Sequence, residues 1–415
     1  MLIKNVEVEG CGLVDVRIHG GHIVEIGERL AGRGDVDGRG GALLPGLHDH
    51  HVHLPALAAE AASVRVGPAD VSGPDGFAVA LRSGAPGEWV RAVGYHESVA
   101  GELDRWVLDG AAADRPVRVQ HRSGALWVWN SAALQAVGLT GDGRFFRQDE
   151  RLRELVPPVR LDLEGVGHRA AALGITGFTN ADPHPGDGLA DMLSVLPQRV
   201  VVMGIDTPTK MVLDDTTLPT PGELAAAIAA VRPGPVAIHC VTRAQLLVTL
   251  LALDEAGPVE GDRIEHGSVI PAETIPWLRR LGVTVVTQPH FPMERAREYA
   301  VDVDAGDRAH LYRCRSLVEA GIVIAAGTDA PFGTSDPWSV MRAAAERSGP
   351  ERLTRRASLD LFLGEPGHIG RPRRVGVGAV ADLCLLHGPL REALDVLSHE
   401  MVRAAFVGGR QITAT

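Results

Sequence analysis

The stretch GALLPGLHDHHVH, residues 41–53, is an apolar ramp that ends in two histidines, His51 and His53. A short aliphatic run of this kind is typical of a buried strand. Side chains at i and i+2 of a strand lie on the same face, so the two imidazoles can approach one ion. Imidazole nitrogen is a common ligand of zinc and related metals. In a chain with 17 histidines the pair alone is weak evidence, and the interpretation depends on polar residues at later strand ends.

The composition limits the classes of protein to which the chain can belong. The chain has 415 residues, of which 45% are hydrophobic and 22% charged, as in a globular enzyme with one large barrel and an accessory domain. The formal net charge of −11 argues against a nucleic-acid or anionic-membrane partner and leaves a small-molecule substrate. The four cysteines show no CxxC spacing, so we expect neither a disulfide framework nor a thiolate zinc site. Without a signal-peptide pattern or an apolar stretch of about 18 residues, we expect a cytoplasmic protein, by default a homodimer.

The pattern of strands and helices predicts an α/β fold. Both ends of the chain alternate like antiparallel strands, so we expect residues 1–42 and 368–415 to form one terminal β-sandwich domain. Residues 43–367 alternate strands with helices about eight times, which predicts a (β/α)8 TIM barrel. Residues from about 55 to 165 interrupt the alternation and are expected to form a lobe inserted after the first barrel strand. The predicted barrel strands are 42–48, 175–181, 200–205, 211–214, 236–240, 263–266, 283–287 and 322–327.

Polar residues recur at the predicted strand ends. Lys210 opens the fourth strand, His239 and His266 end the fifth and sixth, and Asp329 follows the eighth. In a barrel of this type the carboxyl ends of the strands meet at one mouth, where the working residues lie. Each residue alone is more often an ordinary core or surface residue. Together with the histidine pair, at five strand ends in order, they indicate a metal site.

Each residue type suits metal-assisted hydrolysis. A divalent metal lowers the pKa of a bound water to roughly 7, and Asp329 could bind the metal, accept the proton of that water and pass it to a leaving nitrogen. A desolvated Lys210 loses its proton readily, and its neutral amine can add carbon dioxide to form a carbamate that bridges two metals. The alternative is that Lys210 remains a cation that forms a salt bridge with Asp214 or Asp215.

These segments resemble a known superfamily. LLPGLHDHHVHL, TKMVLDD, VAIHC, RIEHG and GTDAP together resemble the amidohydrolases. Residues 121–139 and 325–347 resemble the branch that includes N-substituted formamide deformylase and related metal-dependent hydrolases. The resemblance covers nearly the whole chain. The sequence departs from the family pattern at His48 and His50, where an aliphatic and a small residue are more usual, and at Asp215, where glycine is usual.

The resemblance implies one or two divalent metal ions, with Zn²⁺ the first expectation and iron, manganese or cobalt the alternatives. The implied metal ligands are His51, His53, Lys210, His239, His266 and Asp329. The histidine pair would bind the more buried metal, the lysine carbamate would bridge, and the two single histidines would bind the second metal. The aspartate would be both ligand and general base. His121 in the inserted lobe and His290 after the seventh strand would contact the substrate.

Three functions remain open at this point. The first is hydrolysis of a non-peptide C–N bond, in an amide, an N-substituted formamide or a cyclic amide. The second is deamination of a heterocycle with one metal, which release of ammonia and indifference to the substitution Lys210→Ala would favour. The third is a barrel that has lost its chemistry and serves as a binding module, which a purified protein with little bound metal would favour.

Overall fold

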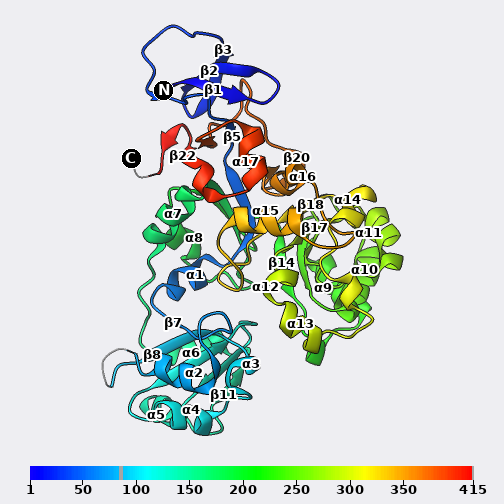
Figure 1. Cartoon of the computed structure of the whole chain (residues 1–415). Coiled ribbons are helices and arrows are strands. Elements are labelled where there is room, and N and C mark those ends of the chain that lie inside the picture. Colours follow the sequence, from blue (N-terminus) through cyan, green and yellow to red (C-terminus); the bar gives the residue numbers. More distant parts are fainter. Residues whose placement is uncertain (84–86, 414–415) are drawn as a thin grey trace. The chain divides into compact units, whose positions relative to one another are not determined.

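The computed structural model describes residues 1–83 and 87–413, which fall into two compact units (Figure 1). One unit comprises Met1–Leu54 together with the chain from Leu163 onward, and the other comprises Pro55–Asp162. Both units mix helices and strands. No helix of the described part of the chain has both the length and the apolar character needed to span a bilayer.

Two four-stranded sheets combine the ends of the chain. Their strand orders are β3-β2-β1-β4 and β23-β22-β21-β5, so β5 from the N-terminal part pairs with β21 from the C-terminal part. Ile3 of the first sheet packs in one hydrophobic cluster with Leu385 and Phe406 of the second. Gly20 and Gly21 have φ of 57° and 79° and form the turn between β2 and β3. The strands are β1 (Leu2–Val8), β2 (Gly12–His19), β3 (His22–Gly27), β4 (Val36–Asp37), β5 (Leu43–Pro45), β21 (Leu383–Leu386), β22 (Val402–Val407) and β23 (Arg410–Gln411).

The predicted strand at residues 42–48 is wrong, because two strands meet there. β5 ends at Pro45 in the terminal sheet, whereas β6 (Leu47–Val52) pairs in parallel with β12. Pro45 has no N–H to continue a ladder. A Cβ at Gly46 would lie 2.1 Å from Cγ2 of Thr176, so only glycine allows this close approach. The chain therefore changes sheets just before the histidine pair.

Eight parallel strands carry the site. They form a three-stranded sheet, β13-β12-β6, and a five-stranded sheet, β14-β15-β16-β17-β18. The backbone N–H of Asp329 donates to the carbonyl of His51 (2.8 Å), and that of His53 donates to the carbonyl of Ala330 (2.9 Å), so the end of β6 lies against the segment after β18. The strands other than β6 are β12 (Ile175–Asn180), β13 (Arg199–Val202), β14 (Thr209–Val212), β15 (Val236–Cys240), β16 (Arg263–His266), β17 (Thr284–Thr287) and β18 (Ile324–Ala326).

Capping residues set the helix boundaries. α9 (Pro221–Val231) begins with a capping box between Thr220 and Glu223, and α10 (Arg243–Ala256) begins at the cap Thr242. Pro271 is followed by a single 3-10 turn (Ala272–Thr274), after which α11 (Ile275–Leu281) begins. The remaining helices of this unit are α7 (Leu163–Ala172), α8 (Leu189–Leu193), α12 (Phe291–Glu294), α13 (Ala296–Asp302), α14 (Arg315–Glu319), α15 (Pro337–Glu346), α16 (Arg355–Asp360) and α17 (Leu390–Val396), with the hairpin β19 (Gly364–Glu365) and β20 (His368–Pro372).

The second unit is built on one five-stranded sheet with the order β11-β10-β9-β8-β7. β7, β8 and β9 are parallel, whereas β10 and β11 are antiparallel to their neighbours. The fully buried Asn130 caps α5 by accepting from the N–H of Ala133 (2.8 Å), and it also accepts from the N–H of Val117 (3.0 Å). The elements are α1 (Leu54–Glu60), β7 (Val64–Arg65), α2 (Gly73–Leu81), β8 (Val90–Tyr95), α3 (Glu97–Ala100), α4 (Arg105–Ala111), β9 (Val117–His121), β10 (Leu126–Trp129), α5 (Ser131–Ala136), β11 (Arg144–Phe146) and α6 (Asp149–Leu155).

Candidate metal centre

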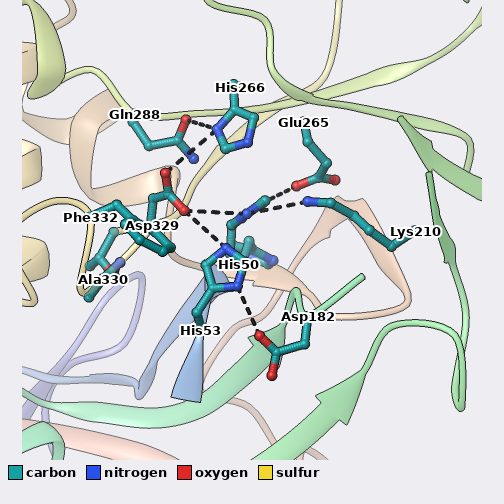
Figure 2. Close-up of polar contacts among 12 residues, drawn as sticks. His50, His53, Asp182, Lys210, Glu265, His266, Gln288, Asp329, Ala330 and Phe332 are labelled. Carbon is teal, nitrogen blue, oxygen red and sulfur yellow. Dashed lines mark hydrogen bonds and ion pairs between the residues drawn. The ribbon is translucent and has the colours of Figure 1, made fainter. Parts of the chain in front are cut away.

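The two histidines at the end of β6 converge on one carboxylate. Nδ1 of His53 lies 3.0 Å from Oδ1 of Asp182 (Figure 2). Nδ1 of the fully buried His51 contacts the carboxylate of Glu265. Because a carboxylate holds each ring at Nδ1, the two Nε2 atoms are directed elsewhere. They lie 3.5 Å (His51) and 3.3 Å (His53) from the same oxygen, Oδ1 of Asp329.

Asp329 is held in an uncommon backbone conformation. Its φ of 54° is in the left-handed region, which non-glycine residues adopt rarely and at a cost of about 1–3 kcal/mol. Its own N–H bonds to His51, and Asp49 fixes the preceding residue by accepting from the N–H of Thr328 (3.0 Å) and from its hydroxyl (2.5 Å). Oδ1 of Asp329 is buried and has no hydrogen-bond partner among the described residues. The fold therefore presents a bare carboxylate oxygen to two imidazole nitrogens.

A second left-handed residue brings both Glu265 and His266 to the site. Neighbouring residues of a regular strand point to opposite faces. His266 ends β16 with φ of 67°, and Gly267 follows with φ of 54°, so the alternation breaks there. Nδ1 of His266 consequently lies 2.9 Å from Oε1 of Gln288 and 3.9 Å from Oδ2 of Asp329, as Figure 2 shows.

His239 completes a row of three imidazoles. It lies on β15 in register with Glu265 of β16. The ring centroids of His239 and His266 are 4.6 Å apart, and those of His266 and His51 are 4.7 Å apart. The single histidines predicted at the fifth and sixth strand ends are thus next to the histidine pair.

Lys210 enters the same cluster from β14. Its Nζ lies 3.4 Å from Nε2 of His51. Burial lowers the pKa of Lys210, although the carboxylates of Glu265 and Asp329 act in the opposite direction. Nζ of Lys210 thus lies against the histidine pair, and its role as a carbamate or as a cation remains a prediction.

The electrostatics of the cluster favour neutral imidazoles at His51 and His266 and a positive charge at His53, beside the carboxylates. Burial, reinforced by neighbouring cationic groups, lowers the pKa values of His51 and His266 well below the usual range. Burial also acts to lower the pKa of His53, but the carboxylates of Asp182 and Asp329 outweigh it and raise this pKa to about 9. Neutral imidazoles beside ionised carboxylates are the donor set that divalent metals prefer.

The donor atoms have the spacing that a first-row metal needs. One ligand atom from each of His51, His53 and Asp329 lies within 4.8 Å of the other two. Two donors about 2.0–2.2 Å from one ion, at near-tetrahedral angles, are about 3.2–3.6 Å apart. The measured separations from Asp329 Oδ1 to the two Nε2 atoms, 3.3 and 3.5 Å, fall in this range. The residues present therefore fit a divalent metal.

The two predicted substrate contacts, His290 and His121, belong to different units. His290 is buried, packs against Phe291 with ring centroids 4.6 Å apart, and has no hydrogen-bond partner among the residues that the structure describes. Burial and the nearby Arg295 lower its pKa to about 3. His121 belongs to the second unit, where Nε2 lies 3.2 Å from Oε2 of Glu97. Its role toward a substrate remains a prediction.

His121 belongs to a second group of metal-type residues, with His96 and Glu97. Nδ1 of His96 accepts from the N–H of Ser98, and Nδ1 of His121 accepts from the N–H of Ser123, each at 3.1 Å. A neutral ring that accepts at Nδ1 carries its proton on Nε2. Nε2 of His121 lies 3.2 Å from Oε2 of Glu97 and Nε2 of His96 lies 3.7 Å from the same oxygen, so one carboxylate faces both rings.

Sequence reasoning missed the residues that orient the ligands. Asp182, Glu265 and Gln288 hold the Nδ1 atoms of His53, His51 and His266 respectively. Asp182 and Gln288 follow β12 and β17, and Glu265 is the penultimate residue of β16, next to the predicted ligand His266. A search for acceptor side chains at every strand end, beyond the histidines, would have found them.

Comparison with known proteins gives the family. The sequence profile of the amidohydrolase family matches residues 197–413, more than half of the chain. A candidate amidohydrolase of Bacillus subtilis (strain 168), YtcJ, is 29% identical over 124 residues, which span 28% of this chain and 23% of that relative. The stretch shared with this curated relative is thus less than a quarter of the relative's length.

Solved structures share the fold. An uncharacterised metal-dependent hydrolase from Pyrococcus furiosus superposes with a TM-score of 0.68 at 20% identity, covering 91% of this chain and 97% of that chain. A mutant of atrazine chlorohydrolase TrzN from Arthrobacter aurescens TC1, complexed with zinc and atraton, gives a TM-score of 0.56 at 16% identity, covering 99% and 95%. With the profile match and the geometry of the cluster, these findings lead to one assignment: the chain belongs to the amidohydrolase family.

Proposed function

We propose that the protein is a metal-dependent hydrolase of a C–N bond other than a peptide bond, in an amide, an N-substituted formamide or a cyclic amide. Family membership supports the reaction class. The observation that carries the proposal is the bare, buried Oδ1 of Asp329 within 3.3 and 3.5 Å of two imidazole nitrogens. The resemblance of residues 121–139 and 325–347 to the N-substituted formamide deformylase branch makes formamides the first substrates to test.

We also propose how the parallel strands and the terminal sheets are arranged. The eight parallel strands would close into a (β/α)8 barrel, and residues 1–42 and 368–415 would form a β-sandwich domain. The hydrogen bonds between β6 and the segment after β18 support closure at that edge. The hydrophobic cluster shared by β1–β3 with β21 and β22 supports the sandwich. A closed barrel would bring the carboxyl ends of all eight strands to one mouth.

The chain offers ligands for one or two divalent ions. His51, His53 and Asp329 would hold the first, for which zinc is the best match and iron, manganese or cobalt are alternatives. His239, His266 and Lys210 would hold the second, the lysine as a bridging carbamate. When bound, the metal supplies Lewis acidity that polarises the scissile carbonyl and lowers the pKa of the attacking water.

The residues of the chain would transfer the protons and orient the metal ligands. Asp329 would accept the proton of the attacking water at its carboxylate and deliver it to the leaving nitrogen. Glu265 and Asp182 orient the rings of His51 and His53 through Nδ1. Because burial lowers the pKa of Lys210, its neutral amine can form an N–C bond with carbon dioxide and release a proton, which gives the carbamate.

A substrate screen tests the proposal directly. Protein loaded with zinc, manganese or cobalt is assayed against N-substituted formamides, linear amides, lactams and carbamates, with formate, carboxylate and amine release as readouts. We expect hydrolysis of at least one class, and loss of at least about 10³-fold in kcat/KM in Asp329→Asn. Activity that survives in Asp329→Asn, or a well-loaded protein that cleaves no C–N bond in the panel, would contradict the proposal.

One observation favours the alternative, a heterocycle deaminase with a single metal. The ligand atoms of His51, His53 and Asp329 alone form a complete three-ligand group, whereas Lys210 contacts His51 as an amine. The substitution Lys210→Met separates the two functions. A drop from two bound metals to one, with loss of hydrolysis, supports the two-metal hydrolase. Unchanged metal content together with ammonia release from aminated heterocycles supports the deaminase.

A further inference from the structure

Two arginines lie side by side on one face of the sheet in the second unit. Arg91 of β8 and Arg118 of β9 are directly opposite each other in the parallel register. Trp127 of β10 lies beneath both, with its ring centroid 5.3 Å from the guanidinium carbon of Arg91 and 5.5 Å from that of Arg118. Two like charges are therefore held together over one aromatic ring.

Arg118 has no partner that neutralises its charge. Only 9% of the residue is exposed, its Nε is buried without a hydrogen bond, and the described parts of the chain give it neither a hydrogen bond nor an ion pair. Arg115, also buried in the same unit, shows the usual solution: it pairs with Asp114 at 2.9 Å and donates to the carbonyl of Arg82 at 3.2 Å. Arg118 is thus an exception to the rule that buried charges are paired.

Two carboxylates, Glu60 and Asp149, act on Arg91, whereas none is bonded to Arg118 within the described residues. Asp149 accepts from Nε1 of Trp127 at 2.7 Å, and Glu60 accepts from Arg65 at 2.8 Å. Arg91 itself donates to the hydroxyl of Ser63. Burial lowers the pKa of both Arg91 and Arg118 to about 10, and the charge of Arg118 contributes to the shift at Arg91. Both guanidiniums remain protonated at neutral pH, so the excess positive charge persists.

We propose that Arg91 and Arg118 form a binding site for a small oxyanion, the carboxylate or phosphate group of a ligand, on the second unit. A guanidinium presents its N–H donors in a planar fork that matches two oxygens of an oxyanion. Trp127 lies against both guanidinium groups, and Nε of Arg118 has no hydrogen bond within the described residues. The site does not depend on the proposed hydrolysis, because all of its residues belong to Pro55–Asp162.

The test uses the full-length protein and measures binding rather than activity. Inorganic phosphate and acetate are titrated separately at constant ionic strength, with chloride as the reference anion, while tryptophan fluorescence and thermal unfolding are recorded. With a dissociation constant of about 1 mM, 20 mM anion stabilises the folded unit about 20-fold and raises its unfolding midpoint by a few degrees. Because Trp127 contacts both arginines, we also expect a saturable fluorescence change.

Variants separate a binding site from a structural pair. Arg118→Met should lose the phosphate or acetate response, and without added oxyanion it should be at least as stable as the wild type, because an uncompensated buried charge has been removed. The control Arg144→Met, at an exposed arginine of β11 that pairs with Glu102, should keep the response. Should Arg118→Met fail to fold, Arg118→Lys retains the charge without the fork and should bind at least about 10-fold more weakly.

The outcomes are distinct. A response to phosphate alone indicates that the site binds a phosphate group, and a response to acetate alone indicates a carboxylate. A response to both anions indicates that the site recognises either group. Each of these results supports the site. No saturable response of the wild type to either anion would overturn the proposal. A response that persists unchanged in Arg118→Met or Arg118→Lys would overturn it as well, since the anion would then bind elsewhere.

Discussion

Asp182 is expected to control metal affinity through His53 without being a metal ligand. Its Oδ1 lies 3.0 Å from Nδ1 of His53, and its Oδ2 accepts from the side chain of Asn180 at 3.1 Å. Asp182→Ala removes the acceptor that fixes the ring and its tautomer. A charge-assisted hydrogen bond contributes about 1.5–3 kcal/mol of interaction free energy. Because this carboxylate is 23% exposed, we expect the loss of metal-binding free energy to be near the lower end of that range. That corresponds to about 10–30-fold weaker metal binding, which is within the range for residues that hydrogen-bond to a metal ligand.

The assay is competition for zinc between the protein and a chelator with a coloured metal complex. Asp187→Ala is the matched control, because Asp187 is an exposed aspartate in the loop that follows Asp182. We expect the control to bind zinc like the wild type and both variants to unfold at similar temperatures in the presence of chelator. Affinity of Asp182→Ala within about twofold of the wild type would refute the reasoning, because it would show that the contact to His53 does not orient the ring.

Three further predictions concern the structure around the site. Removal of the metal by a chelator should lower the unfolding temperature measured by scanning calorimetry. Metal restored at about 100 times its dissociation constant should raise the free energy of unfolding by about 2.7 kcal/mol. Equal unfolding temperatures with and without metal would contradict a metal held by the folded state. Arg232→Met should destabilise the protein by about 3–5 kcal/mol in urea unfolding, because Asp262, which is 1% exposed, loses the cation that donates to it from both terminal nitrogens at 2.8 and 2.7 Å and keeps backbone N–H donors instead. A loss below about 1 kcal/mol would contradict this prediction. Gly327→Ala places a Cβ 2.4 Å from Cβ of His51 and should therefore displace this histidine and reduce both metal content and stability. Elemental analysis of the purified variant measures the metal content. A variant with its full metal content would show that the site tolerates the displacement of His51.

Strand–helix alternation could be predicted from the sequence because it depends on local patterns. The run VAIHC becomes β15, and the helices α9 and α10 lie between parallel strands as the alternation predicts. The break between β5 and β6 could not be predicted in this way. It depends on Gly46 lying against Thr176, a contact between residues 130 positions apart.

The metal-type residues of the cluster were predictable because they combine rare side chains with strand ends, as at His239 and Asp329. The orienting residues were not, because an acidic or amide side chain after a strand is common and only its partner gives it meaning. Glu265 illustrates the difficulty. A regular strand would have directed it away from the face of His266, and only the left-handed backbone of that histidine brings both inward.

The central claim is that His51, His53 and Asp329 share one divalent metal, and anomalous diffraction from crystals of the zinc-loaded protein tests it most directly. Data collected on both sides of the zinc absorption edge locate the metal without reference to the protein chemistry. We expect a zinc peak about 2.0–2.2 Å from Nε2 of both histidines and from a carboxylate oxygen of Asp329. Zinc-replete crystals with no peak at this position, or with zinc bound only at His96, Glu97 and His121, would contradict the claim.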